Sequence, residues 1–362
     1  MVIKMMTMKK IMTYLAAAVA LTACSSDIEP IDANNKTKDI RFSVAGINTS
    51  NAPMQSWADE QSTATPWSAD SHANTLGVFG YADGNTEIFR NQTVTYTAGR
   101  WEYSPSRFWK DYPGSSFCFF GYMVENDELP EATVSANGAS RTLSFPASIS
   151  TPILLSADNT PLICHMPHHT TAIGEAIPFA MDHTLTGYAI EFRLDATMGS
   201  ARHFVIKSVK VYGNDIPVGG TVSRTYTLSG STWTAGSVTW TNLTTSHVTE
   251  SSAVELHSNP ITVGKDFVKW GGSNTTDGTF YAIPYAGFNP TIAVTYDVYT
   301  NNGATLSRKD ITSNIILNKD HFSALTAGTA GETQTIKIAI APDNLYVLAD
   351  DDQLSGILVV GE

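Results

Sequence analysis

Three histidines and a cysteine gather in one short stretch of the sequence. His165, His168 and His169 follow Cys164, and imidazole and thiolate groups at such spacing can bind Zn²⁺. On a helix, residues 165 and 169 would share a face, but Pro167 lies between them and opposes a helix. No HExxH motif occurs in the chain, and no acidic residue lies between positions 164 and 173. We therefore interpret these residues as polar loop histidines around a buried cysteine and predict no metal site.

Other residues that can carry chemistry lack the spacing that the chemistry needs. Asp350, Asp351 and Asp352 are possible Ca²⁺ ligands, but the glycine and the distal glutamate of an EF-hand loop are missing, so we interpret them as a solvated acidic turn. His183 alternates with apolar residues, which is typical of a structural histidine in a strand. The chain has no glycine-rich phosphate loop and no GxSxG elbow. We predict no enzyme activity, no catalytic residues and no cofactor. The alternative from the enzyme class is a β-sandwich hydrolase, which would need convergent carboxylates in a cleft.

The tryptophans are the residues most able to bind a sugar, because an indole ring offers a flat stacking surface. Trp101 and Trp109 lie within apolar strand-like runs, so we assign them to the core. Trp233 and Trp240 lie among threonines and serines and are the better candidates for an exposed adhesive face.

The first 24 residues read as an export signal. Lys9 and Lys10 precede a ten-residue apolar run, Ile11–Ala20, which is too short to span a bilayer core of about 30 Å. Leu21-Thr22-Ala23-Cys24 resembles the lipobox of bacterial lipoproteins, which implies removal of residues 1–23 and attachment of lipid to Cys24. The alternative is an ordinary cleaved signal followed by a chance cysteine. Residues 24–39 are polar and read as a flexible tether.

The composition limits the classes of partner. The chain has 362 residues, a net charge of −12 and only 15% charged residues, whereas an average domain has about 25%. No cluster of lysine or arginine could neutralise phosphates, so we predict no nucleic-acid partner. Cys118 and Cys164 can form one disulfide or remain buried thiols, and their apolar neighbours favour thiols.

The folded part is predicted to be all-β. Short runs that alternate apolar and polar residues are separated by turn signals about every 8–12 residues, which is typical of β-sandwiches with Greek-key connections. We predict two sandwich domains, residues 40–175 and 176–362. The expected strands include Leu76–Tyr81, Trp101–Tyr103, Ser116–Val124, Phe204–Tyr212 (closed by Gly213-Asn214), Thr291–Thr300, Thr335–Ile340 and Ile357–Val360.

Several of these runs together resemble the fimbrillin-like lipoproteins of Bacteroidales, which include subunits of type V pili. The resemblance covers roughly residues 40–340 and rests on loose apolar spacings. The runs that carry it are Ile40-Arg41-Phe42, Leu76–Phe79, Trp101–Tyr103 with Phe108-Trp109, the aromatic run Phe117–Tyr122, Ile177–Phe192 with its F-x-H-x-L-like pattern, and Leu325–Gly328 followed by Ile336–Ile340.

The resemblance implies two transthyretin-like sandwiches and assembly with other pilus subunits, or with copies of itself, by β-strand addition. It implies that Ile40–Gly46 is a removable first strand, with Arg41 as a possible protease cleavage site. The donor strand at the end of the chain would be Ile357, Leu358, Val359 and Val360. Residues 48–56, where many members of the family carry an arginine, contain none.

The resemblance leaves stalk, anchor and tip roles open. It also leaves open a stand-alone surface adhesin, or a glycan-binding lipoprotein, that does not polymerise. In each case the expected location is the outer membrane at the cell surface, with a host or bacterial glycan or protein as an additional partner.

Overall fold

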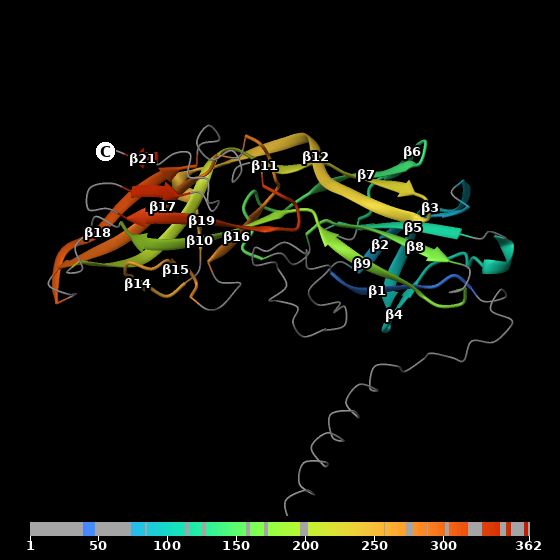
Figure 1. The fold of residues 1–362 in the computed structure, drawn as a ribbon, viewed down its shortest axis with the longest axis horizontal. Helices are drawn as coiled ribbons and strands as arrows, with labels where there is room; N and C mark the ends of the chain where they lie inside the picture. The colour runs from blue at the N-terminus through green and yellow to red at the C-terminus, as the bar shows by residue number, and fades with distance from the viewer. Residues whose placement is uncertain are drawn as a thin grey trace, which may run out of the picture.

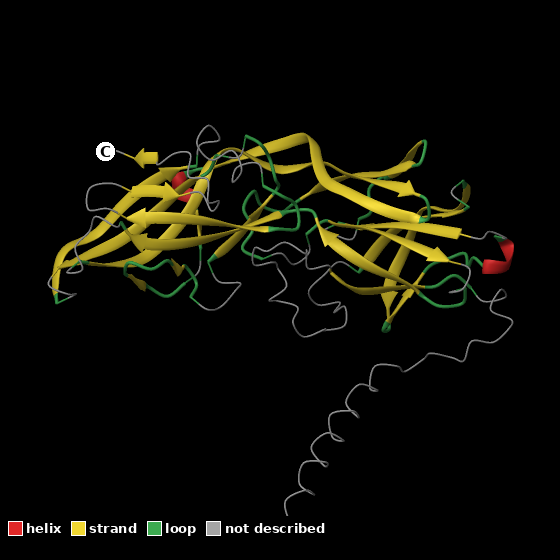
Figure 2. Cartoon of the chain, in the orientation of Figure 1, coloured by secondary structure: helices red, strands yellow, loops and turns green. Residues whose placement is uncertain are grey.

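The computed structural model shows a protein built almost entirely of β-strands (Figures 1 and 2). The helices among the described residues are two single turns, η3 (Trp109–Asp111) and η5 (Glu250–Ser252). The all-β fold class predicted from the sequence is therefore confirmed. The structure describes residues 39–47, 74–83, 85–112, 116–124, 128–156, 160–169, 173–195, 202–256, 258–272, 278–287, 289–300, 304–317, 328–340, 345–348 and 358–360. Within them, no helix has the length and apolar character needed to cross a membrane.

The first sheet has seven strands in the order β1-β9-β8-β5-β2-β3-β4. Its strands are β1 (Phe42–Ile47), β2 (Thr75–Ala82), β3 (Thr86–Thr97), β4 (Arg100–Glu102), β5 (Ser116–Met123), β8 (Leu162–His169) and β9 (Ile177–His183). The β3–β4 hairpin turns at Ala98 and Gly99, which both have positive φ, as a tight hairpin turn requires. All neighbours in this sheet are antiparallel except β1 and β9, which run parallel.

The second sheet has eight strands and is centred on one very long strand. Its strands are β6 (Thr133–Asn137), β7 (Ser140–Ser148), β11 (His203–Ser229), β12 (Thr232–Val248), β13 (Val254–Glu255), β14 (Ile261–Val263), β17 (Thr291–Thr300) and β18 (Thr305–Ile316). The third sheet contains β10 (Thr186–Leu194), β15 (Val268–Lys269), β16 (Thr279–Ala282), β19 (Thr333–Ile340), β20 (Leu345–Leu348) and β21 (Leu358–Val360).

Strand β11 passes from one half of the elongated molecule to the other (Figure 1). Its first ten residues pair with β17, and residues 219–227 pair with β7. The sequence predicts that Gly213-Asn214 closes this strand, and that prediction is wrong. The strand continues there through a bulge, with Asp215 at φ 53°, and exchanges one partner strand for another.

Three clusters of buried side chains form the core. One lies between β10, β19, the first part of β11 and β17. A second lies on one face of the seven-stranded sheet, and a third lies between the other face of that sheet and the layer made by β7, β11 and β12. The third cluster contains residues from both sides of the predicted boundary at 175/176. The division at that boundary and the Greek-key detail stay predictions.

Candidate functional site

Strand β1 occupies an edge of the seven-stranded sheet in the described part of the chain (Figure 1). It pairs with β9 alone, with Phe42 opposite Ile177 and Val44 opposite Phe179. Ile40, Phe42 and Val44 are buried to 0%, 4% and 9% exposure, whereas Arg41 between them is exposed. This alternation is what the sequence predicted. We use the term β1 slot for the position that β1 occupies beside β9, together with the pockets that hold the side chains of Ile40, Phe42 and Val44.

The central pocket of the β1 slot is made of aromatic rings. The ring of Phe42 stacks on that of Phe179 at 5.7 Å and meets those of Phe89 at 5.4 Å, Tyr103 at 5.6 Å and Phe119 at 6.0 Å. We call these four surrounding residues the aromatic box. They come from β9, β3, the segment after β4, and β5, so four separate parts of the sheet enclose one side chain. Sequence reasoning did not identify the box, because only tertiary pairing brings its members together.

Ile40, two residues before β1, has both of its main-chain polar groups hydrogen-bonded. The Ile40 N–H donates to the Arg107 carbonyl at 2.8 Å, and the Tyr103 hydroxyl donates to the Ile40 carbonyl at 2.6 Å. Burial raises the pKa of Tyr103 to about 12, so this hydroxyl keeps its proton and remains a donor at neutral pH. Among the described residues, the strand from Phe42 onward pairs on one side only. Ile40 therefore clamps the start of a strand whose remainder is an open edge.

Arg41 lies directly before β1, with its side chain half exposed at 50%. Its guanidinium donates to the Gly174 carbonyl at 3.3 Å, and its own carbonyl accepts from the Ile177 N–H at 2.8 Å. The next arginine in the sequence is Arg90. A cut after Arg41 would therefore separate the clamped Ile40 from β1 and leave Phe42 and Val44 attached to the body of the protein. Whether Arg41 is cleaved stays a prediction.

The last strand lies in the other half of the molecule (Figure 1). Leu358, Val359 and Val360 form β21, which pairs antiparallel with β20. Ile357, the remaining residue of the predicted donor strand, lies outside the described residues, as do Cys24 and Asp350–Asp352. The third sheet ends at β21, so its outer edge has no partner strand among the described residues.

The two cysteines of the folded part are free thiols. Cys164 lies opposite Gly121 and Cys118 lies opposite Pro167 on the same pair of strands, three positions apart. Cys118 belongs to the third cluster and Cys164 to the second, on the opposite face of the sheet. Burial raises the pKa of Cys118 to about 12 and that of Cys164 well above its usual value. The favoured interpretation as buried thiols is confirmed.

The cysteine and histidines that suggested a metal lie on strand β8, so their interpretation as loop residues is wrong. Successive residues of a strand point to opposite faces of the sheet, and Cys164 and His165 belong to opposite cores for this reason. Among the described residues, no group of three or more His, Cys, Asp or Glu is placed to hold a metal ion. The buried His183 contacts Thr160, with Nδ1 3.3 Å from the hydroxyl oxygen.

His165 lies among three rings of the third cluster. Its imidazole is 4.8 Å from Phe120, 4.9 Å from Tyr226 and 4.9 Å from Trp233, measured between ring centroids. Burial, together with the nearby positive charge of Arg224, lowers the pKa of His165 to about 4. The imidazole is therefore neutral at pH 7. Its contacts with these aromatic rings connect β8 to the layer formed by β11 and β12.

The candidate adhesive tryptophans do not form an exposed face. Trp240 is 9% exposed and donates its indole N–H to the Thr184 carbonyl at 2.8 Å. Trp233 is half-buried against the third cluster. Strand alternation turns both indoles inward, while the threonines beside them face outward. Trp101 and Trp109 are core residues, as predicted. Trp57 and Trp67 lie outside the described residues.

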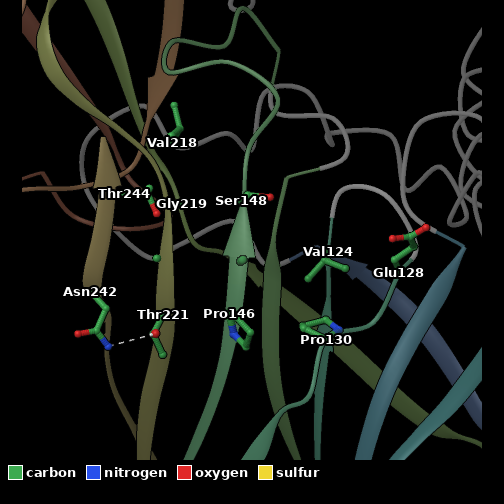
Figure 3. A pocket seen from close by; sticks show the side chains of 12 residues that line it. Val124, Glu128, Pro130, Pro146, Ser148, Val218, Gly219, Thr221, Asn242 and Thr244 are labelled. Atoms are coloured by element: carbon green, nitrogen blue, oxygen red, sulfur yellow. Dashed lines mark hydrogen bonds between the residues drawn. The ribbon is translucent and has the colours of Figure 1, made fainter. Parts of the chain in front are cut away.

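An open pocket of about 600 Å³ lies where β7, β11 and β12 meet the segment after β5 (Figure 3). Asn242 donates to the Thr221 hydroxyl at 3.4 Å on one side, and Figure 3 shows Glu128 on the opposite side. Its lining includes Ser148, Thr244 and several aliphatic or proline residues, but no aromatic ring and no basic side chain. The described residues of its lining therefore provide no aromatic stacking surface.

Comparisons with known proteins give distant structural neighbours only. No protein-family model matches the chain, and no curated protein matches it. Solved structures with a similar chain path include a fimbrial protein from Bacteroides vulgatus (14% identity, 89% of this chain and 99% of that chain, TM-score 0.43). A candidate cell adhesion protein from Bacteroides uniformis (13%, 89% and 98%, TM-score 0.40) and a fimbrial assembly protein from Parabacteroides distasonis (8%, 80% and 92%, TM-score 0.37) are further examples.

At these identities and TM-scores the likeness is remote, and the function proposed below rests on residues of this chain. The descriptions of these three solved structures name fimbrial and cell adhesion proteins.

Proposed function

We propose that this chain is a non-catalytic subunit of a surface fibre, of the fimbrillin-like kind, that joins its neighbours by strand exchange at the β1 slot. One observation carries the proposal. β1 is a short edge strand held by one neighbour, yet its alternate side chains fill deep pockets. This is the pattern of β-augmentation, in which main-chain hydrogen bonds supply affinity and side-chain pockets supply register.

The positions of the two terminal strands support a fibre rather than a closed dimer. β1 and β21 lie in opposite halves of an elongated molecule (Figure 1). If β21 of one subunit fills the β1 slot of the next, the contact joins two different surfaces. Contacts of that type repeat head to tail and produce open filaments unless the rotation closes a ring.

The test uses the purified chain from residue 25 with an Arg-specific protease. A single cut after Arg41 removes the Ile40 clamp, so β1 becomes a free-ended edge strand. We expect intact mass to show the cut and sizing without boiling to show stable multimers. The matched control is Arg41→Gln, which should remain uncut at this position and monomeric. A cleanly cut chain that stays monomeric would contradict strand exchange between copies of this chain.

A second variant tests the donor end. Removal of residues 350–362 should abolish multimers after the same cut, because the donor strand is lost. If multimers form without residues 350–362, the donor is another segment. If β1 and β21 both stay paired within one chain after cleavage, the protein is a stand-alone surface protein.

We propose the outer membrane as the place of attachment, with lipid on Cys24. Labelled fatty acid should be incorporated into the expressed chain, which should partition with membranes. Cys24→Ser should lose both properties. If Cys24→Ser still incorporates fatty acid and partitions with membranes, Cys24 is not the site of lipid attachment.

A further inference from the structure

The aromatic box sets a requirement on any strand that replaces β1. Phe42 is enclosed by four rings at centroid distances of 5.4–6.0 Å. Ile40 and Val44, two residues to either side, are also buried. The slot therefore has three pockets in the order aliphatic, aromatic, aliphatic. Truncation of a buried Phe to Ala leaves a cavity that costs about 3–5 kcal/mol, so an unfilled central pocket is a large penalty.

The direction of the strand is also fixed. β1 runs parallel to β9, and the Ile177 N–H donates to the carbonyl of Arg41. At the other side, the Tyr103 hydroxyl donates to the carbonyl of Ile40. Both donors serve main-chain oxygens, so they accept any residue type at these positions. The pockets, and not these hydrogen bonds, select the sequence.

The C-terminal strand of this chain does not satisfy that requirement. Its sequence, Gly356-Ile357-Leu358-Val359-Val360-Gly361, contains no aromatic residue in any register. Either choice of alternate residues from it presents only aliphatic side chains or glycine to the slot. The space that Phe42 fills would then be only partly occupied.

We propose that the β1 slot takes a strand from a different protein, one that carries an aliphatic-x-aromatic-x-aliphatic segment and runs parallel to β9, in preference to the C-terminal strand of a second copy of this chain. This inference rests on the proposed function, since it assumes that β1 can be exchanged. It assigns the partner by chemistry: an extended segment with Phe, Tyr or Trp at its centre. Exchange between copies of this chain through β21 would then be the weaker mode, seen when the cut chain is the only protein in solution.

The experiment opens the slot in the full chain from residue 25. A seven-residue site for a sequence-specific protease is inserted between Asn51 and Ala52, so that cleavage leaves β1 held only by non-covalent contacts. Labelled peptides are then added in excess, and exchange is followed by fluorescence anisotropy and native mass. The uncut chain is the control in which β1 remains covalently attached and no exchange is expected.

Five peptides separate the contributions. The first is the chain's own Asp39–Ile47, and the second is the same peptide with Phe42→Ala. The third carries Arg41→Phe together with Phe42→Arg, which keeps the composition and moves the aromatic ring to the opposite face of the strand. The fourth is the C-terminal segment of residues 354–362. The fifth is this C-terminal segment with Leu358→Phe.

We expect the first peptide to exchange and the second to bind at least ~100-fold more weakly, from the cost of the empty pocket. The third peptide, which presents an arginine to the aromatic box, should be at least as weak as the second. The C-terminal peptide should bind as weakly as the second peptide. Leu358→Phe should raise the affinity of the C-terminal peptide at least ~10-fold.

Two failures are distinguishable. If the C-terminal peptide binds as tightly as Asp39–Ile47, the inference is wrong and self-assembly stands. If no peptide exchanges, including Asp39–Ile47, then β1 is a permanent strand and the proposed function itself fails.

Discussion

Two edge strands of this molecule, β1 and β12, are held to their sheets by different kinds of contact. β1 is six residues long and buries Phe42 among four aromatic rings and Val44 beside them. β12 is 17 residues long, but only Trp240 and Val248 are buried, and most of its outward side chains are threonine or serine. Strand edges invite pairing with other chains. β1 is therefore an edge strand held by side chains in pockets, whereas β12 is held by its backbone hydrogen bonds to β11.

The ladder of β12 is irregular in a way that hinders pairing with another chain. Its register with β11 shifts four times, including shifts beside Gly236 and Asn242. Arg224 of β11 donates to the Gly236 carbonyl at 2.7 Å and forms an ion pair with Asp182. Bulges twist an edge away from a flat template. β1 has one shift, after Val44, and keeps a regular start.

The largest difference between the two edges should appear on truncation of one side chain. Phe42→Ala should lower the free energy of unfolding by about 3–5 kcal/mol, because it empties the aromatic box. Thr239→Ala on β12 should change it by less than ~1 kcal/mol, since it removes only exposed hydroxyl contacts with Ser223, to its hydroxyl at 2.8 Å and to its carbonyl at 3.3 Å. Urea unfolding of both variants measures this. Equal effects would remove the distinction between the edges.

Acid should loosen the β12 side before the β1 side. The pKa of His165 is lowered to about 4 in the folded protein, below the unfolded value of about 6.5. The folded state therefore binds fewer protons, so the stability from neutral His165 is complete above pH 6.5 and is lost as the pH falls toward 4, by about 3 kcal/mol.

The measurement is urea unfolding at pH 7 and pH 4 for the natural chain and His165→Gln. The difference between the two pH values should be smaller in the variant. Hydrogen exchange at pH 4 should rise in β12, which contacts His165 through Trp233, more than in β1, whose Phe42 belongs to the second cluster on the other face of the sheet. An unchanged pH dependence in His165→Gln would contradict this assignment.

Loss of the clamp on Ile40 should have a moderate effect. Tyr103→Phe removes the donor to the Ile40 carbonyl and should cost about 1–2 kcal/mol. Amide exchange at the start of β1 should accelerate. Tyr96→Phe is the matched control, because that ring packs on Trp101 at 5.3 Å, away from Ile40. Equal acceleration of β1 in both variants would show that the hydrogen bond is not the cause.

The smallest effect is expected on the hydroxyl-rich face of the second sheet. Thr142 and Thr225 share a hydrogen bond of 2.8 Å between β7 and β11. Thr142→Ala should cost about 0.2–1 kcal/mol, the usual range for such pairs. A double-mutant cycle with Thr225→Ala measures the coupling. A coupling well above ~1 kcal/mol would mean that this face contributes as much as a buried contact.

The local strand pattern was visible in the sequence, but the partners of the strands were not. The alternation of Ile40, Phe42 and Val44 predicts one buried face, and the structure has it. The members of the aromatic box are far apart in the chain and only the sheet order brings them together. Gly213-Asn214 looked like a strand end because a bulge and a turn use the same residue types.

The histidines at 165–169 show the same limit. Pro167 opposes a helix, and the structure has a strand at this position. A proline does not exclude a strand, and in β8 Pro167 lies opposite Cys118. Trp233 and Trp240 looked exposed because their sequence neighbours are polar. In a strand those neighbours face the other way, so local polarity says nothing about the indoles.

The continuity of β11 has a mechanical consequence. A pull along the long axis of the molecule would load the β17 ladder at one end of β11 and the β7 ladder at the other. The covalent backbone of a single strand joins the two ladders, so tension would pass between the halves through peptide bonds. Each ladder would then be loaded in shear along its strands, with many hydrogen bonds sharing the force at once.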